Sequence, residues 1–136
     1  MATIRLWTDD DVAANRRVKA VFDDIRATRK SDFVNNFWRA LANDSATLER
    51  TWSALKEIMV APGSLDPLTK ELVYIAVSTM NSCPYCVHSH TAAARAKGLT
   101  DAQYTEFLSV LRMAAQTNAL ANGLQIPIDP EFLVGR

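Results

Sequence analysis

The sequence predicts an all-α protein with a single domain of five to six helices. The first 61 residues contain neither Gly nor Pro, the two residues that most often interrupt a helix. Through most of the chain, apolar residues recur every three or four positions, which is the spacing of an amphipathic helix. No segment is rich in strand signals, and the β-branched run over residues 73–77 lies within a longer helical pattern.

Three helices are expected before Pro62 and Gly63, which end the third. Each follows a polar residue suited to a helix N-terminus. These residues are Thr8 with Asp11, then Ser31, then Asp44 or Ser45. The apolar stripes of the three helices are, in order, Val18, Val21, Phe22 and Ile25; Phe33, Phe37 and Leu41; and Leu48, Trp52, Leu55 and Met59.

A fourth helix is expected to begin at Asp66-Pro67, a capping carboxylate followed by Pro at the first helical position. It runs to about Met80 and is apolar on nearly all sides, so we expect it to be central and buried. Pro84 is suited to open a fifth helix, which Gly98 ends.

A last helix is expected after Thr100, which forms a capping box with Gln103. This helix ends near Asn122-Gly123, and the tail with Pro127 and Pro130 is expected to be irregular.

Length and charge narrow the class of protein. A chain of 136 residues is long enough to enclose one hydrophobic core. Its 15 Lys and Arg residues balance its 15 Asp and Glu residues, so it has no general attraction for nucleic acid or anionic membranes. No stretch reaches the roughly 20 apolar residues of a membrane span, and the N-terminus lacks the pattern of a secretory signal. We therefore expect a cytoplasmic protein without nucleic-acid or membrane partners.

Every Cys and every His of the chain lies between Cys83 and His90, in the order Cys83-Pro84-Tyr85-Cys86-Val87-His88-Ser89-His90. Thiols and imidazoles are the side chains best suited to redox, nucleophilic or metal chemistry near neutral pH. Their clustering indicates a functional site, because residues used only for packing are more often scattered.

The position of this cluster at a helix N-terminus favours thiol chemistry. Cys83, Cys86 and His90 are three and four residues apart, so they share one face of the helix, whereas His88 points elsewhere. The helix dipole and the free N–H groups of the first turn lower the pKa of a thiol at this position. Two cysteines three residues apart are also suited to cycle between dithiol and disulfide.

Glu71 is the unusual residue of the fourth helix, because a carboxylate among apolar residues is either on a narrow solvent face or buried with a partner. Glu71 lies roughly 16 Å back from the turn near Ser82, and His90 lies roughly 12 Å forward from it. In an antiparallel hairpin, Glu71 and His90 therefore lie at similar heights along the two helices. Glu71, His90 and a thiol are therefore expected to form a proton relay.

These residues resemble the alkylhydroperoxidase AhpD family of the carboxymuconolactone decarboxylase-like superfamily. The resemblance rests on Glu71, eleven intervening residues, and then Cys83-x-x-Cys86-x-x-x-His90. It covers residues 62–98 clearly and the helical layout of the rest loosely. It implies one AhpD-like helical domain over residues 1–136, with the motif hairpin at about residues 62–98. It also implies a homo-oligomer, a trimer or a hexamer.

The resemblance implies a thiol-dependent peroxidase that acts in antioxidant defence. Cys86 matches the peroxidatic cysteine, which attacks a hydroperoxide and becomes a sulfenic acid, and Cys83 matches the resolving cysteine, which forms the redox-active disulfide. His90 and Glu71 match the relay that takes the thiol proton. A dithiol or a redox protein would restore the pair, and no flavin, haem or metal cofactor is expected.

Two positions differ from the family pattern. Tyr85 stands where the best-known members have a histidine before the second cysteine, and a tyrosine cannot take a proton near pH 7 as an imidazole does. His88 has no counterpart in the motif. Both are kept as supporting candidates for the site.

Two alternatives remain open. The same cysteine pair is suited to a thiol-disulfide oxidoreductase or to a redox sensor that acts on a protein target. The other alternative is a non-catalytic, oligomeric helical protein whose cysteine pair is vestigial or binds zinc. Four ligands within eight residues is an unusually tight spacing for structural zinc, which usually collects its ligands from two separated segments.

Overall fold

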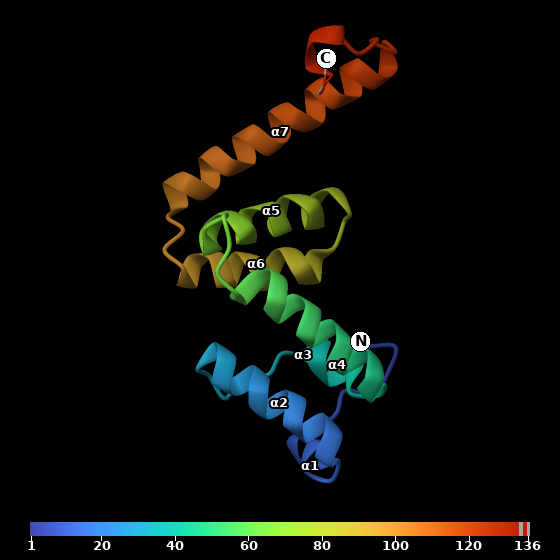
Figure 1. Cartoon of the computed structure of the whole chain (residues 1–136), viewed down its shortest axis with the longest axis vertical. Helices are drawn as coiled ribbons and strands as arrows, with labels where there is room; N and C mark the ends of the chain where they lie inside the picture. The colour runs from blue at the N-terminus through green and yellow to red at the C-terminus, as the bar shows by residue number, and fades with distance from the viewer. Residues whose placement is uncertain (134, 136) are drawn as a thin grey trace. The chain divides into compact units, whose positions relative to one another are not determined.

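The structure of the protein is a computed structural model that describes residues 1–133 and 135 (Figure 1). These residues contain seven α-helices, one π-helical turn and one 3₁₀ turn, and no strand. The all-α prediction is therefore confirmed. The chain divides into two compact units, Met1–Gly63 and Ser64–Arg136, and each is described by itself. The single domain over residues 1–136 stays a prediction.

The first unit encloses its own hydrophobic core. It consists of α1 (Asp9–Ala13), α2 (Arg16–Arg29), α3 (Asn36–Leu41), α4 (Ser45–Leu55) and the π-helical turn η1 (Lys56–Val60). The buried apolar residues come from all four α-helices and from the residues that flank α3, because each helix turns one apolar face inward. They are Val12, Val18, Val21, Phe22, Ile25, Val34, Trp38, Ala42, Leu48 and Trp52.

The first expected helix is in fact two helices, which is why the count is seven. Thr8 and Asp11 form the predicted capping box, but it opens only the five-residue α1. The Asn15 side chain then accepts hydrogen bonds from the backbone N–H groups of Arg17 and Val18, and so caps a separate α2. An Asn in extended conformation thus separates the two helices without any Gly or Pro.

The second expected helix begins later than predicted. Its N-cap residue is Asn35, not Ser31, and Phe33 lies outside the helix with 70% of its surface exposed. The Arg26 side chain donates a hydrogen bond to the carbonyl of Asp32, and the Arg39 side chain donates one to the carbonyl of Val34. These two hydrogen bonds hold the segment in a non-helical conformation. The core residue of α3 is therefore Trp38, which is 1% exposed.

The second unit is built on a hairpin of two antiparallel helices. It consists of α5 (Pro67–Met80), α6 (Pro84–Ala96), α7 (Asp101–Gly123) and the 3₁₀ turn η2 (Pro130–Phe132). The three predicted N-terminal signals are confirmed, with Asp66, Cys83 and Thr100 as the N-cap residues of α5, α6 and α7. The buried residues Ile75, Ala94 and Leu99 form the small core of this unit.

The expectation that α5 is buried on nearly all sides is wrong for the isolated chain. Only Glu71, Ile75 and Ser78 of this helix are buried, and all three lie on the face that packs against α6. Four of its other apolar residues are at least one-third exposed, namely Val73, Tyr74, Val77 and Met80, whereas Leu68, Leu72 and Ala76 are partly buried.

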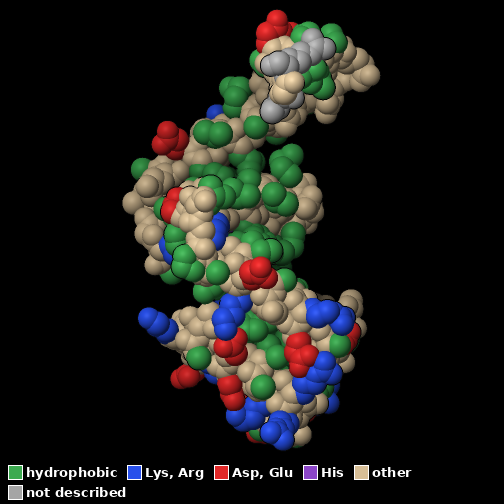
Figure 2. Space-filling model, in the orientation of Figure 1, with side chains coloured by type: hydrophobic (Ala, Val, Ile, Leu, Met, Phe, Trp, Pro, Cys, Tyr) green, Lys and Arg blue, Asp and Glu red, His purple; other side chains and the backbone are tan. Residues whose placement is uncertain are grey.

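The long helix α7 contains no buried residue. Four of its large apolar side chains are exposed, namely Leu108, Val110, Met113 and Leu120, whereas Tyr104 and Phe107 are partly buried against the core of this unit. Figure 2 shows hydrophobic side chains gathered over the α5–α6 hairpin, whereas Lys, Arg, Asp and Glu side chains cover much of the visible face of the first unit. None of the helices in the described residues combines the length and the apolar character needed to cross a bilayer.

Candidate functional site

A tight turn between α5 and α6 brings the two cysteines to the start of α6. Ser82 adopts a left-handed conformation with φ of 55°, and the Cys83 N–H donates a hydrogen bond of 2.9 Å to the carbonyl of Ser78. Cys83 is the N-cap residue, and its Sγ accepts a hydrogen bond of 3.4 Å from the backbone N–H of Cys86. The predicted position of the C-x-x-C motif at a helix N-terminus is confirmed.

The two thiols are free, partly exposed and interact with each other. Hydrogen bonds from the Cys86 thiol and from the Cys86 backbone N–H lower the pKa of Cys83. The hydrogen bond to Cys83 and partial burial raise the pKa of Cys86. The pair therefore loses its first proton easily and its second with difficulty, and the first negative charge lies mainly on Cys83.

Glu71 and His90 are in direct contact, as predicted from the helix levels. The distance between His90 Nδ1 and Glu71 Oε2 is 2.7 Å, and the two side chains are only 18% and 7% exposed. A carboxylate oxygen accepts hydrogen bonds, so Nδ1 carries the proton in the neutral ring. This leaves Nε2 of His90 as the nitrogen that is able to accept a further proton.

Two further residues, Lys97 and Tyr74, hold this pair. Lys97 Nζ donates a hydrogen bond of 3.0 Å to Oε1 of Glu71. The Tyr74 ring stacks on the His90 ring, with 3.7 Å between centroids and 21° between planes. Sequence reasoning missed both, although Lys97 lies two helical turns after His90 and Tyr74 lies one turn after Glu71, which places each on the same face.

Glu71 is ionised at neutral pH in this environment. Burial acts to raise the pKa of Glu71, but the hydrogen bonds and charges of His90 and Lys97 outweigh it and lower the pKa below its ordinary value. Burial, followed by the negative charges of Cys86, Glu71 and Cys83, raises the pKa of Tyr74, so this phenol keeps its proton.

Ser78 connects α5 to both cysteines. This serine is 5% exposed, and its carbonyl accepts the hydrogen bond from Cys83 N–H. A hydrogen bond with the Ser78 side chain acts to lower the pKa of Cys86, although it does not outweigh the effect of Cys83. The motif does not identify this serine, because its importance depends on how α5 packs on α6.

The two supporting candidates lie on the surface of α6. His88 is exposed, as expected from its position off the shared face, and Tyr85 is 44% exposed in the first turn. Among the described residues, no three His, Cys, Asp or Glu side chains are arranged so that they could hold a metal ion. The roles of His88 and Tyr85 remain predictions.

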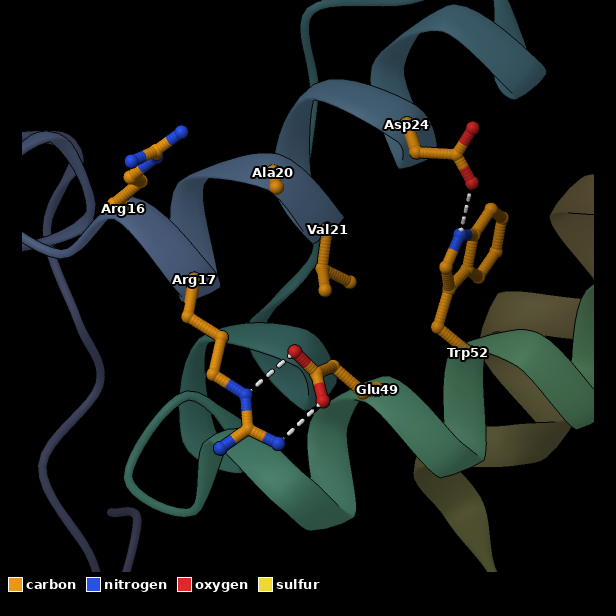
Figure 3. A pocket seen from close by; sticks show the side chains of 7 residues that line it. All are labelled: Arg16, Arg17, Ala20, Val21, Asp24, Glu49 and Trp52. Atoms are coloured by element: carbon orange, nitrogen blue, oxygen red, sulfur yellow. Dashed lines mark hydrogen bonds and ion pairs between the residues drawn. The ribbon is translucent and has the colours of Figure 1, made fainter.

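Two hollows occur elsewhere in the described residues. One, of about 520 Å³, lies on the first unit beside α2 and α4, where Arg17 forms two hydrogen bonds with Glu49, and Asp24 accepts one from Trp52 (Figure 3). The other, of about 420 Å³, is lined mainly by apolar residues of α5 and α7. Neither hollow is lined by Cys83 or Cys86.

Comparisons with known proteins place these residues in a family. Residues 46–129 match the profile described as "Carboxymuconolactone decarboxylase family". The chain is 63% identical to the alkylhydroperoxidase AhpD core from Rhodospirillum rubrum, whose crystal structure superposes with a TM-score of 0.97 and a coverage of 99% of both chains.

Curated relatives match a shorter part of the chain. An uncharacterized protein in the cox locus of Paracoccus denitrificans is 35% identical over 65 residues, which is 48% of this chain and 59% of that protein. The alkyl hydroperoxide reductase AhpD of Solibacter usitatus is 36% identical over 76 residues, 56% of this chain and 41% of that protein. The AhpD of Maricaulis maris is 41% identical over 64 residues, 47% of this chain and 35% of that protein. The chain thus matches only between about a third and three fifths of the length of these relatives.

Proposed function

Because this chain belongs to the carboxymuconolactone decarboxylase family and carries a paired-cysteine motif, we propose that it is a thiol-dependent peroxidase of the alkyl hydroperoxide reductase type. The observation that carries this proposal is the contact between Glu71 and His90, 2.7 Å apart on the two helices that also position Cys83 and Cys86. Relatives named AhpD support it.

The first step is attack by Cys86 on the peroxide. The raised pKa of the Cys86 thiol means that it needs a base, and Nε2 of His90 is the available acceptor. The thiolate attacks one peroxide oxygen, so an S–O bond forms and the O–O bond breaks. The sulfur is oxidised by two electrons to a sulfenic acid, and the leaving alkoxide takes the proton from His90 and becomes an alcohol.

Cys83 then completes the first half of the cycle. Its lowered pKa makes it a ready thiolate, which attacks the Cys86 sulfur three residues away. The S–S bond forms, the S–O bond breaks, and the departing hydroxide is protonated to water. An external dithiol or redox protein returns two electrons and two protons, which restores both thiols.

Glu71 supports the base throughout this cycle. As a carboxylate it accepts the Nδ1–H hydrogen bond, which fixes the tautomer and orientation of the His90 ring. It also stabilises the imidazolium that forms when Nε2 accepts the thiol proton. The reaction needs no metal or organic cofactor.

The test is hydroperoxide consumption with a small dithiol as reductant. We expect turnover with the unaltered protein, none with Cys86→Ser, and accumulation of a sulfenic acid that reacts with dimedone in Cys83→Ser. His90→Gln is expected to lower the rate strongly, whereas His88→Gln, which removes an exposed ring two residues away, is not. Equal rates for the unaltered protein and Cys86→Ser would contradict the proposal.

A second candidate function is thiol-disulfide exchange with a protein target. The lowered pKa and partial exposure of Cys83 favour it, because a thiolate at the surface is suited to attack another protein's disulfide. Reduction of a disulfide substrate without peroxide turnover would favour this function over the first.

We also propose that the protein is a homo-oligomer, a trimer or a hexamer. A 23-residue helix without a buried residue, together with the exposed apolar face of α5, indicates that these surfaces are covered in solution. Sedimentation equilibrium measures the mass directly, and a monomer at micromolar concentration would refute this proposal. The cytoplasmic location stays a prediction of the sequence.

A further inference from the structure

Each oxygen of the buried Glu71 carboxylate has its own partner on α6. His90 Nδ1 lies 2.7 Å from Oε2, and Lys97 Nζ lies 3.0 Å from Oε1. These partners are seven residues apart, which is two turns of helix, so they point from the same face of α6 toward α5. Lys97 stands at the C-cap of α6, where the last turn leaves its side chain 36% exposed.

We propose that Lys97 is a positioning residue of this site, which holds Glu71 in the charge and orientation that fix the His90 ring. Its effect on turnover rests on the proposed peroxidase function, but its effect on Glu71 does not. Lys97 touches neither cysteine through any described hydrogen bond, so it acts only through Glu71.

Burial makes the charge of Glu71 depend on its partners. Glu71 is 5% exposed, and a buried carboxylate without partners gives up its charge rather than remain ionised. A neutral imidazole supplies one hydrogen bond but no net charge. Among the described residues, Lys97 is therefore the one permanent positive charge that an ion pair brings to this carboxylate.

Lys97 also fixes how the two carboxylate oxygens of Glu71 are used. Its ammonium group donates a hydrogen bond to Oε1, which leaves Oε2 to accept the Nδ1–H hydrogen bond of His90. This arrangement leaves Nε2 of His90 as the nitrogen that is able to accept the Cys86 proton.

The titratable groups around Glu71 come from both helices of the hairpin. His90 and Lys97 face it from α6, and the charges of Glu71, Cys83 and Cys86 all act on Tyr74 of α5. Burial acts against ionisation of Glu71, and the hydrogen bonds and charges of His90 and Lys97 favour it. Removal of the Lys97 charge is therefore expected to raise the pKa of Glu71, which then keeps its proton to a higher pH.

The experiment compares Lys97→Met with Lys97→Arg, which keeps the charge, and with Arg95→Met as the matched control. Arg95 lies two residues away on α6 but pairs with Asp101, at 2.7 Å, and not with Glu71. Lys97→Gln serves as a second neutral variant, and circular dichroism confirms that each variant is folded.

The first readout is the ¹³C NMR titration of the Glu71 carboxyl group, assigned with Glu71→Gln. We expect the midpoint to rise by about 1 to 2 pH units in Lys97→Met and Lys97→Gln, and to stay unchanged in Lys97→Arg and Arg95→Met. A midpoint in the unaltered protein at or above the ordinary glutamate value, or no change in either neutral variant, would overturn the inference. This readout needs no peroxide turnover.

The second readout is the pH dependence of kcat/KM for hydroperoxide reduction. We expect the acid limb to move to higher pH in the neutral variants, because Glu71 then holds its proton to a higher pH and supports His90 less well as a carboxylate. A uniform loss of rate with an unshifted profile would identify Lys97 as merely structural. If the unaltered protein shows no turnover, the proposed function fails while the NMR titration still decides the role of Lys97.

Discussion

Glu71→Gln is the substitution that tests the relay most directly. Glutamine has nearly the same shape as glutamate, and its oxygen is still able to accept the His90 Nδ1–H hydrogen bond. It carries no charge, so it stabilises the imidazolium far less when His90 accepts a proton. Since general-base catalysis contributes roughly 10² to 10⁴ in rate, we expect kcat/KM to fall by about 100-fold.

The same substitution also affects stability, and the structure sets the size of this effect. Loss of one partner of a fully buried ion pair costs about 3 to 5 kcal/mol. Here the carboxylate side chain is 7% exposed but the Lys97 side chain is 36% exposed, so the ammonium is able to turn toward water. We therefore expect a loss of only about 1 kcal/mol in the free energy of unfolding.

The assays are steady-state peroxide reduction with a dithiol and equilibrium unfolding in urea. The control is Glu106→Gln, which removes an exposed carboxylate from α7, away from the hairpin contact. We expect this control to match the unaltered protein in both assays. A value of kcat/KM for Glu71→Gln within about two-fold of the control would refute the relay, because the loss of transition-state stabilisation would then be negligible.

Three other expectations follow from the same contacts. In Cys83→Ser, we expect the pKa of Cys86 to fall, because the hydrogen bond and charge of Cys83 act to raise it. Alkylation of Cys86 at a series of pH values, followed by mass spectrometry, measures this pKa. An unchanged profile would count against the coupling of the two cysteines. Tyr74→Phe keeps the ring that stacks on His90, so we expect it to retain most of the activity. Tyr74→Ala loses this stacking, which is worth about 1 kcal/mol, and we expect kcat/KM to fall roughly five-fold. Equal losses in both variants would show that stacking on His90 does not account for the effect of Tyr74. The lowered pKa of Glu71 stabilises the fold at pH values above the unfolded-state pKa of about 4.3, and this contribution is lost as the pH falls through the lower folded-state pKa. The difference in unfolding free energy between the unaltered protein and Glu71→Gln is therefore expected to shrink in acid. A constant difference down to about pH 3 would contradict this expectation.

Most helix starts could be predicted because capping is local. The side chains of Asp66 and Thr100 accept hydrogen bonds from backbone N–H groups within three residues, so the residues of the sequence motif are the residues that form the cap. The break between α1 and α2 is also local, since Asn15 caps α2, but Thr8 offered an earlier start for one long helix. The late start of α3 could not be predicted, because hydrogen bonds from Arg26 and Arg39 prevent it from starting at Ser31.

The candidate site likewise has features that the sequence predicts and features that it does not. The motif itself placed Cys83 and Cys86 at the N-terminus of α6, and the rise of a helix was enough to bring Glu71 level with His90. These features depend only on distances along the chain, which any antiparallel hairpin of these helices would share.

Only the tertiary structure decided which side chains complete the site. The contacts of Lys97 with Glu71 and of Tyr74 with His90 depend on how α5 is rotated against α6, and a different rotation would turn these side chains to solvent. The hydrogen bond of the Ser78 side chain, which acts to lower the pKa of Cys86, also depends on how α5 packs on α6. Helix periodicity determines which residues share a face, but the packing of two helices determines what that face meets.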